Sequence, residues 1–352
     1  MNLDDAGGLA AADPFDTRGV LADFPRQCRE ARTLRPTPAG PRERPRVIVV
    51  AGMGGSAAGG DLLAACAADA LDVPVLVHRG YGLPAAAAGP HALVLASSYS
   101  GDTEEVLSAV EAAVSREVAV VALTAGGRLG ALAERHRLAR VTLPAGLMPR
   151  MALGYLFLPA LGVLAACGAP VADDADIDEA LDVLEALAVE LAPSRPAASN
   201  EAKRLALAIG DRLPAVYGGP VTGPVAYRWK TDLEENAKTF ALAGALPEMN
   251  HNEIEAWRPP EAARLHALLL REEGEPAEIA RRFSLLRDII GPAAGGMSET
   301  RARGRTRLAR LLSLAYLGQW TSYYLALRRG IDPWTVPRLD ELKRRLRSTT
   351  SS

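Results

Sequence analysis

The sequence predicts an α/β protein built from two lobes, each a parallel sheet flanked by helices. The chain has 352 residues, and domains cluster near roughly 100 to 200 residues, so this length predicts two of them. From Val47 onward, short apolar runs typical of strands alternate with helix-like runs. The order strand, glycine turn, hydroxyl and helix occurs in both halves of the chain. Short apolar strands separated by helices are typical of parallel sheets covered on both faces.

The elements follow in a simple order. Residues 1–45 are rich in Ala, Pro, Asp and Arg without a long periodic pattern, which predicts an irregular arm with a short helix near 20–32. A first domain is expected at 46–170, with strands in VIVVAG, PVLVHRG, ALVLASS, VAVVALT and RVTLPAG. Apolar residues at three- and four-residue intervals predict a helix within 171–199, followed by a linker. The second domain, 200–352, contains the strand PAVYGG and ends in two helices.

The composition excludes several classes of partner. The 40 basic and 42 acidic residues give a formal charge of −2, so no overall field attracts nucleic acid or an anionic membrane. Three separated cysteines and five scattered histidines predict no disulfide framework, no metal site and no other cofactor. Residues 151–172 carry no charge, but Pro159 and Pro170 interrupt them, which favours a buried helix plus a loop over a membrane span. A cytoplasmic protein is expected.

Residues 52–60, GMGGSAAGG, form the first candidate site, which we call loop 1. They follow a strand and open a helix, where glycines let the backbone approach a ligand and the first helical N–H groups face it. Gly54, Gly55 and Ser56 stand at this turn. An anion is the expected ligand.

Two nucleotide motifs compete with this interpretation. A mononucleotide P-loop is excluded because no Lys-Ser/Thr pair follows the glycines. Gly52, Gly54 and Ala57 fit the dinucleotide fingerprint, but the next strand ends in His78 and Arg79, where an acidic residue would hold a ribose. These observations favour a simple phosphate over NAD.

Residues 97–103, SSYSGDT, form a second candidate loop, loop 2. They place Ser97, Ser98, Ser100 and Thr103 around a glycine at another helix N-terminus. A helix cap is the structural alternative, since Ser100 or Asp102 could satisfy the first turn. A cap needs one such residue, and this loop has four hydroxyls. The pattern therefore favours a phosphate site.

Together the loops resemble the sugar isomerase (SIS) domain. The later segments EENAK, NHNEIEAW and DELKRRL resemble the bifunctional phosphoglucose/phosphomannose isomerases of that superfamily, so the similarity covers residues 47–346. The resemblance implies two SIS lobes, a homodimer, and interconversion of glucose 6-phosphate or mannose 6-phosphate with fructose 6-phosphate. It also implies phosphate contacts from four hydroxyls: Ser56, Ser98, Ser100 and Thr103.

Aldose–ketose isomerisation needs a carboxylate base, an acid that opens the ring and positive charge near the developing oxyanion. Glu235 in DLEENAK resembles the family's catalytic glutamate, although a solvated helix carboxylate is the alternative. His251 has a reference pKa near 6.5, which suits it to donate or accept a proton on the ring oxygen at neutral pH. The resemblance implies that it reaches the partner subunit's active site. Similarity assigns Lys343, one of only four lysines, to ring opening and to stabilising charge at the sugar oxygens, and Arg150 to neutralising the enediolate. The structural alternatives are a helix-capping role for His251, a solvated basic helix for Lys343 and a surface charge for Arg150.

Two other functions remain open from the sequence. A sugar-phosphate sensor would use the SIS lobes to bind a ligand and regulate a partner without chemistry. An amino-sugar phosphate isomerase would use the same fold on glucosamine 6-phosphate. Because no metal-ligand cluster is evident, activity is expected to survive chelation.

Overall fold

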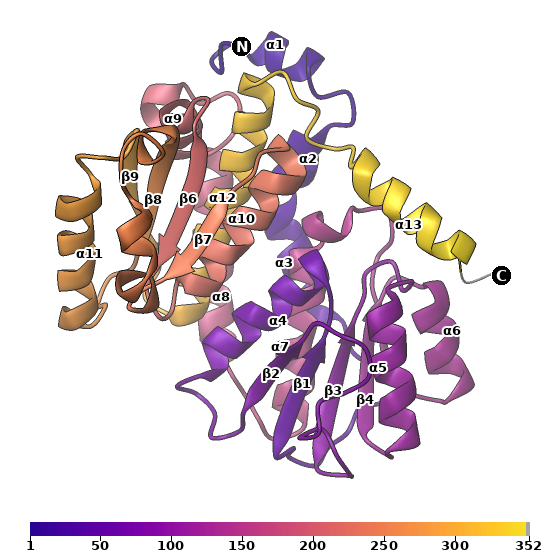
Figure 1. Cartoon of the computed structure of the whole chain (residues 1–352). Helices are drawn as coiled ribbons and strands as arrows, with labels where there is room; N and C mark the ends of the chain where they lie inside the picture. The colour runs from indigo at the N-terminus through magenta and orange to yellow at the C-terminus, as the bar shows by residue number, and fades with distance from the viewer. Residues whose placement is uncertain (350–352) are drawn as a thin grey trace.

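The computed structural model describes residues 1–349, with side chains through 346, and this part of the chain forms two parallel sheets with helices on their faces (Figure 1). The five-stranded sheet has the order β2-β1-β3-β4-β5, and the four-stranded sheet has the order β7-β6-β8-β9. The predicted α/β fold with two lobes is confirmed. In each sheet the chain leaves two neighbouring central strands in opposite directions, which places a switch point at β1/β3 and another at β6/β8.

The first lobe begins with the three strands that surround its switch point. Strand β1 is Val47–Ala51, β2 is Val75–His78 and β3 is Ala92–Ser97. Every residue of β3 is buried, as expected for a central parallel strand covered on both faces. The remaining elements are β4 (Ala119–Thr124), β5 (Ala139–Thr142), η1 (Pro149–Met151) and the helices α4 (Gly54–Ala67), α5 (Glu104–Ser115), α6 (Gly127–Arg135) and α7 (Leu153–Ala166).

The second lobe follows helix α8 (Asp174–Glu190) and the turn η2 (Ala197–Ser199). Its strands are β6 (Leu213–Gly218), β7 (Leu242–Ala245), β8 (Leu265–Arg271) and β9 (Gly296–Arg301). Its helices are α9 (Glu201–Ile209), α10 (Gly223–Ala237), α11 (Ala277–Ile290), α12 (Arg307–Arg328) and α13 (Pro337–Thr349), and its short 3-10 turns are η3 (Glu248–His251), η4 (Glu253–Ala256) and η5 (Ala262–Arg264).

Helix α12 holds the molecule together because it is buried on nearly all sides. It packs against α8, α9 and α10. Its tyrosine hydroxyls find acceptors: Tyr316 donates to the Leu21 carbonyl at 2.8 Å and Tyr324 to the Leu191 carbonyl at 2.6 Å. Buried phenols need such partners, so these bonds fix the end of α8 and the N-terminal arm against α12.

The short helix expected near 20–32 is present, but the prediction that the N-terminal arm is otherwise irregular is wrong, because two more helices precede it. The arm contains three helices, α1 (Ala6–Ala11), α2 (Thr17–Ala22) and α3 (Phe24–Thr33). Helices of this length are marginal in water by themselves, and here they are stabilised by burial of apolar side chains, namely Leu9, Leu21, Phe24 and Cys28. The three helices therefore depend on tertiary packing, which the local sequence pattern of the arm does not reveal.

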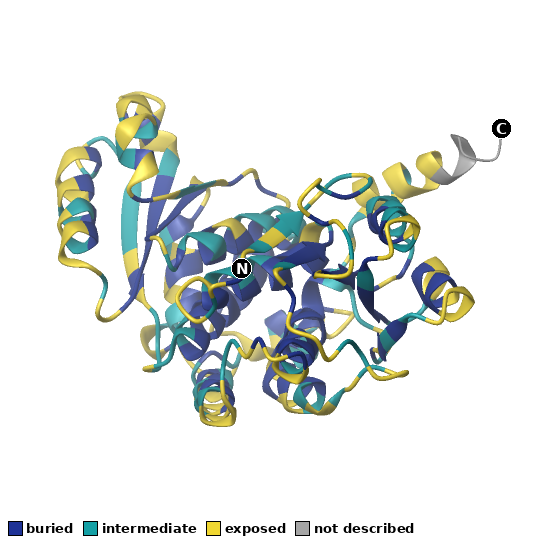
Figure 2. Ribbon diagram, turned by 90° about the horizontal axis from the view of Figure 1, so that it is seen from below, coloured by how far each residue is buried: buried dark blue, intermediate teal, exposed yellow. Residues whose placement is uncertain are grey.

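The uncharged stretch at 151–172 forms the buried helix α7, as expected. In the part of the chain that the structure describes, none of the helices has the length and apolar character needed to cross a membrane. Helix α13 is different, because it projects from the body with most of its side chains exposed (Figure 2).

Candidate active site

The two candidate loops meet at the switch point of the first sheet. Strands β1 and β3 are neighbours, with Ala51 paired to Ala96, so the loops that follow them start side by side. The Ser97 hydroxyl donates to the Ser56 carbonyl at 3.1 Å, and the Tyr99 N–H donates to Ser56 Oγ at 3.3 Å. The hydroxyl of Ser56 is therefore buried between the loops and links them. Ligands in open α/β sheets bind at such a crevice.

Loop 2 is held in one conformation by its own hydroxyls. Ser98 Oγ lies 2.9 Å from Thr103 Oγ1 and accepts the Gly101 N–H at 3.1 Å. Gly101 has φ +76°, and a Cβ there would lie 1.8 Å from the Gly126 carbonyl oxygen. Only glycine fits such a position. Ser100 is exposed at the tip of the loop, so the loop presents hydroxyls at a fixed spacing.

Helices α4 and α5 both begin at this crevice, with Met53 and Thr103 at their N-cap positions. Among the described residues, neither N-cap side chain accepts a bond from its own helix. The alternative of a cap for α5 from Ser100 or Asp102 is not supported, since Thr103 holds that position and Asp102 accepts the Arg128 N–H of α6 at 3.1 Å. First-turn N–H groups and the positive end of each helix dipole therefore face the crevice, which suits an anion.

Arg150 connects this crevice to the second lobe. Its side chain is only 2 % exposed, so the alternative of a surface charge is wrong. A Cβ on Gly55 would lie 2.8 Å from Arg150 Cα, which means that loop 1 touches the backbone of this arginine. The guanidinium donates from Nε to Asn236 Oδ1 at 2.7 Å and lies 3.5 Å from Glu235 Oε2. Burial lowers the pKa of Arg150, and the nearby Glu235 carboxylate opposes that shift.

Glu235 lies in the last turn of α10 with its side chain 24 % exposed. Its neighbour Glu234 pairs with Lys230 at 2.7 Å. Adjacent positions on a helix point to different faces, so the Glu234–Lys230 pair does not involve the Glu235 carboxylate. Glu235 lines a cavity of about 490 Å³ whose walls come from α10, the segment after it and the start of α13. The cavity is large enough for a hexose phosphate.

Three side chains that the sequence did not single out as site residues belong to the polar network around Arg150 and Glu235. Asn236 receives the Arg150 bond and donates to Ser322 Oγ at 2.9 Å. Lys238 donates to the Asp332 carbonyl at 2.6 Å, and burial followed by the charge of Arg150 lowers its pKa to about 8. Asp232 is buried and pairs with Arg228 at 2.7 Å, and burial raises its pKa. The EENAK segment contained Asn236 and Lys238 but gave no sign of their partners.

His251 does not join Glu235 within one chain. Gly223, at the start of α10, abuts Ala245, at the end of β7, and His251 follows β7 in η3. A rise of about 1.5 Å per residue puts Glu235 about 18 Å along α10 from Gly223. His251 ends the 3-10 turn η3, a second 3-10 turn, η4, follows it, and the histidine is exposed.

The segment that carries His251 is nevertheless anchored. The Tyr217 hydroxyl donates to Glu253, and the Trp257 indole N–H donates to Tyr217 Oη at 3.2 Å. Trp257 is buried. The segment thus presents His251 outward from a fixed base.

Lys343 lies on the outer part of α13 and is exposed. It is not among the residues that line the Glu235 cavity, whose α13 wall consists of Pro337, Arg338 and Leu339. One chain therefore brings together the loops, Arg150 and Glu235, and leaves His251 and Lys343 apart from them.

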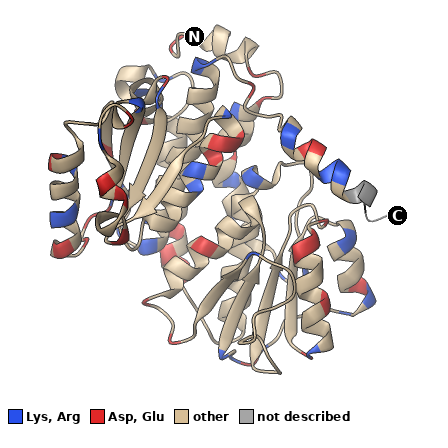
Figure 3. Cartoon of the chain, in the orientation of Figure 1, with Lys and Arg blue, Asp and Glu red and all other residues tan. Residues whose placement is uncertain are grey.

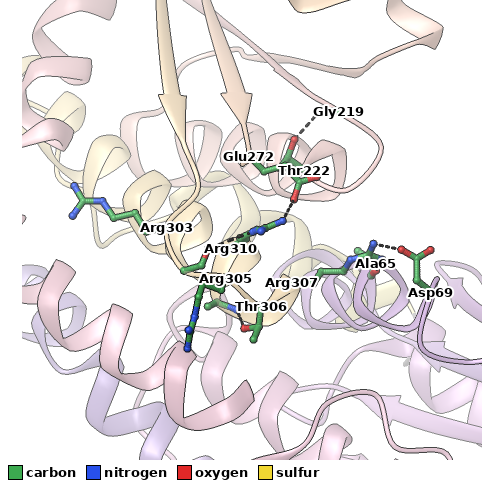
Figure 4. Close-up of polar contacts among 12 residues, drawn as sticks. Ala65, Asp69, Gly219, Thr222, Glu272, Arg303, Arg305, Thr306, Arg307 and Arg310 are labelled. Atoms are coloured by element: carbon green, nitrogen blue, oxygen red, sulfur yellow. Dashed lines mark hydrogen bonds and ion pairs between the residues drawn. The ribbon is translucent and has the colours of Figure 1, made fainter. Parts of the chain in front are cut away.

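The second lobe has an equivalent switch point, but it is closed. After β6, the Gly219 N–H donates to Thr222 Oγ1 at 2.8 Å, and this hydroxyl donates to the Leu270 carbonyl at 2.8 Å. Figure 4 shows the arginines near this loop, with Arg310 directed to Glu272 and Arg307 to Asp69. The Thr222 hydroxyl closes the turn, and Arg310 and Arg307 each have a carboxylate partner.

The surroundings of both sites carry mixed charge. Basic and acidic side chains are interspersed over the two lobes (Figure 3). No group of three or more His, Cys, Asp or Glu side chains is arranged to hold a metal ion within the described residues.

Two parallel-sheet lobes, with a crevice of glycines and hydroxyls at the first switch point, define a double-SIS protein. Residues 198–346 match the family model for the bacterial phospho-glucose isomerase C-terminal SIS domain. The chain is 38 % identical over 302 residues to the bifunctional phosphoglucose/phosphomannose isomerase of Caldicellulosiruptor bescii, covering 85 % of this chain and 89 % of the relative. The chain belongs to the bifunctional phosphoglucose/phosphomannose isomerase family.

Other comparisons agree. The protein of the same name from Thermoplasma acidophilum is 32 % identical over 299 residues, which cover 85 % of this chain and 89 % of that protein. A glucose-6-phosphate isomerase-like protein from Thermus thermophilus has a TM-score of 0.61 at 22 % identity, with 97 % of this chain and 98 % of that chain covered. At that identity the structural match establishes the fold alone.

Proposed function

We propose that this protein interconverts glucose 6-phosphate, mannose 6-phosphate or both with fructose 6-phosphate through an enediolate. One observation carries the proposal: buried Arg150 touches the backbone of loop 1 at Gly55 and faces the Glu235 carboxylate at 3.5 Å. A phosphate site, a cation and a carboxylate base are thus connected through one residue. A sugar-phosphate sensor would need the phosphate site but no buried cation beside a carboxylate.

In this mechanism the phosphate binds at the first turns of α4 and α5. We assign the phosphate contacts to N–H groups of loop 1 and hydroxyls of both loops, from Gly54, Gly55, Ser56, Ser98, Ser100 and Thr103. The sugar carbons extend toward the Glu235 cavity. Glu235 removes the proton from C2 and returns it to C1. The positive charge of Arg150 stabilises the enediolate oxygens as their charge develops.

Ring opening needs further groups, which a single chain does not supply beside Glu235 and Arg150. We assign it to His251 of a second subunit, with Lys343 stabilising charge at the sugar oxygens. The 3-10 turns present His251 outward, and α13 carries Lys343 outside the body of the chain. In the proposed homodimer each site combines Glu235 and Arg150 of one chain with His251 of the other.

The experiment measures turnover of each sugar phosphate with a coupled assay in Glu235→Gln, His251→Ala, and co-expressed mixtures of the two. Glu235→Gln should lower kcat about 10² to 10⁴-fold, the usual effect of a general base, while sugar-phosphate binding persists. Mixed dimers should regain up to about one active site in two, because one of their sites receives both intact groups. Near-normal turnover of Glu235→Gln would contradict the assignment of Glu235 as the base. Absence of complementation would contradict an active site shared between two chains.

A further inference from the structure

The guanidinium of Arg150 is held by segments that are far apart in the sequence. Besides Asn236, its terminal nitrogen donates to the carbonyls of Pro333 at 2.9 Å and Trp334 at 2.6 Å. Its own carbonyl accepts a bond from Arg228, which is paired with Asp232. The side chain therefore has little freedom to follow a substrate, and its placement depends on its supports.

The N-terminal arm reaches the same place from the other side through Gln27 of α3. The Gln27 amide donates to the Met151 carbonyl at 2.9 Å and accepts the Gly154 N–H at 2.8 Å. These two groups lie directly after Arg150, where η1 passes into α7 and the first N–H groups of the helix lack intrahelical partners. Gln27 is 3 % exposed, and a Cβ on Gly154 would lie 2.8 Å from its Oε1. One buried amide thus clamps the chain beside Arg150.

A second contact from the arm reaches the loop that accepts the Arg150 bonds. Phe15 stacks on Trp334 with ring centroids 6.0 Å apart and an interplanar angle of 16°. Phe15 is 51 % exposed, so this contact, and not burial in a core, is its main role in the structure. The turn before α2 is fixed, because Asp13 accepts the N–H groups of Thr17 and Arg18, each at 2.9 Å.

We propose that the N-terminal arm is a positioning element of the active site and that Gln27 is a positioning residue for Arg150. The inference rests on the proposed function, in which Arg150 stabilises the enediolate. A preorganised charge stabilises a transition state without reorganising when the reaction occurs. Gln27 keeps the Arg150 backbone in place from one side, and Phe15 keeps the carbonyl of Trp334 in place from the other. Loss of either support lets the guanidinium move from its position opposite Glu235.

The test uses Gln27→Met, which keeps the length of the side chain and removes both hydrogen bonds. Since a misplacement of about 1 Å can cost up to about 100-fold in rate, we expect kcat to fall about 10-fold or more while KM stays within about twofold. Gln319→Met is the matched control. Gln319 is 1 % exposed, and its amide atoms have no hydrogen-bond partner among the described residues, so this change should leave kcat unchanged.

A double-mutant comparison with Arg150→Met separates positioning from general damage. If Gln27 acts through Arg150, Gln27→Met should have no further effect on kcat once Arg150 is methionine. An equal fold-loss in both backgrounds, or an unchanged kcat in Gln27→Met, would overturn the proposal. Wild-type turnover of Arg150→Met would instead show that the proposed function is wrong about Arg150.

If Gln27→Met does not fold, as judged by circular dichroism, Phe15→Ala carries the test because its side chain is half exposed. We expect Phe15→Ala to lower kcat about threefold or more at unchanged KM, an effect that again disappears in the Arg150→Met background. Wild-type kcat in Phe15→Ala would then overturn the proposal.

Discussion

Loop 1 approaches the proposed catalytic arginine closely at Gly55, and Gly55→Ala tests what depends on this approach. A Cβ there would lie 2.8 Å from Arg150 Cα, 2.9 Å from Arg150 N and 3.0 Å from the Pro149 carbonyl carbon. These are backbone atoms, so no side-chain rotamer relieves the contact. Because favourable contacts between carbons begin at about 3.5 Å, loop 1 and η1 must separate by about 0.7 Å.

We expect two measurable effects of this separation. Overpacking costs about 1 to 3 kcal/mol of unfolding free energy, which denaturant unfolding detects as a lower midpoint. Displacement of Arg150 from Glu235 should lower kcat about 10-fold or more in the coupled isomerase assay. Phosphate binding should weaken as well, because Gly55 belongs to the first turn of α4.

Gly162→Ala is the matched control, since Gly162 lies inside α7 and a Cβ there would meet nothing closer than Arg35 at 3.6 Å. Replacing glycine by alanine inside a helix without a clash stabilises it by about 0.5 to 1 kcal/mol. Gly162→Ala should therefore keep full turnover with equal or greater stability. If Gly55→Ala matches Gly162→Ala in both measurements, the close approach has no bearing on Arg150, and the reasoning is refuted.

Two further predictions concern the phosphate loops and the response to pH. Ser98→Ala and Thr103→Val should raise KM for a sugar phosphate and leave the weak binding of the unphosphorylated sugar unchanged in calorimetry; an equal loss for both ligands would contradict the loop assignment. Burial lowers the pKa of His266 to about 4 from 6.5, so between these values the unfolded state binds the extra proton and stability falls as the pH falls. Urea unfolding should detect a loss of up to roughly 3 kcal/mol in unfolding free energy across that pH window, and His266→Gln should make this dependence on pH shallower. An identical dependence on pH in both proteins would show that His266 is not its source.

The sequence was most informative where function depends on a local pattern. Loops 1 and 2 each combine a strand, glycines, hydroxyls and a helix start within a short segment, and the parallel sheet brings their ends together. The pattern therefore predicted the fold class, which the two parallel sheets confirm, and an anion site between the loops, which stays a prediction. It did not predict that the second-lobe turn after β6 closes on itself, because Thr222 Oγ1 takes a partner on β8, 48 residues away.

The parts that the sequence left open depend on contacts between distant segments. Arg150 was a candidate by resemblance, but its burial comes from Asn236 and from the loop at 333–334. Gln27 bonds to Met151 across 124 residues and carries no motif. The three short arm helices form because of the same tertiary burial, so local propensity could not have revealed them.

The location of the remaining groups argues for a site shared between chains. His251 follows β7, whose end abuts the start of α10 at Gly223, whereas Glu235 lies about 18 Å along α10 from Gly223. The surface around the Glu235 cavity also exposes apolar side chains: Phe240 is 84 % exposed and Leu339 of α13 is 40 % exposed, and both line the cavity. Large apolar side chains gathered at a surface are typical of an interface. A second chain that covered them and supplied its own His251 would complete the set of acid, base and cation that isomerisation needs, and it would exclude water from the enediolate.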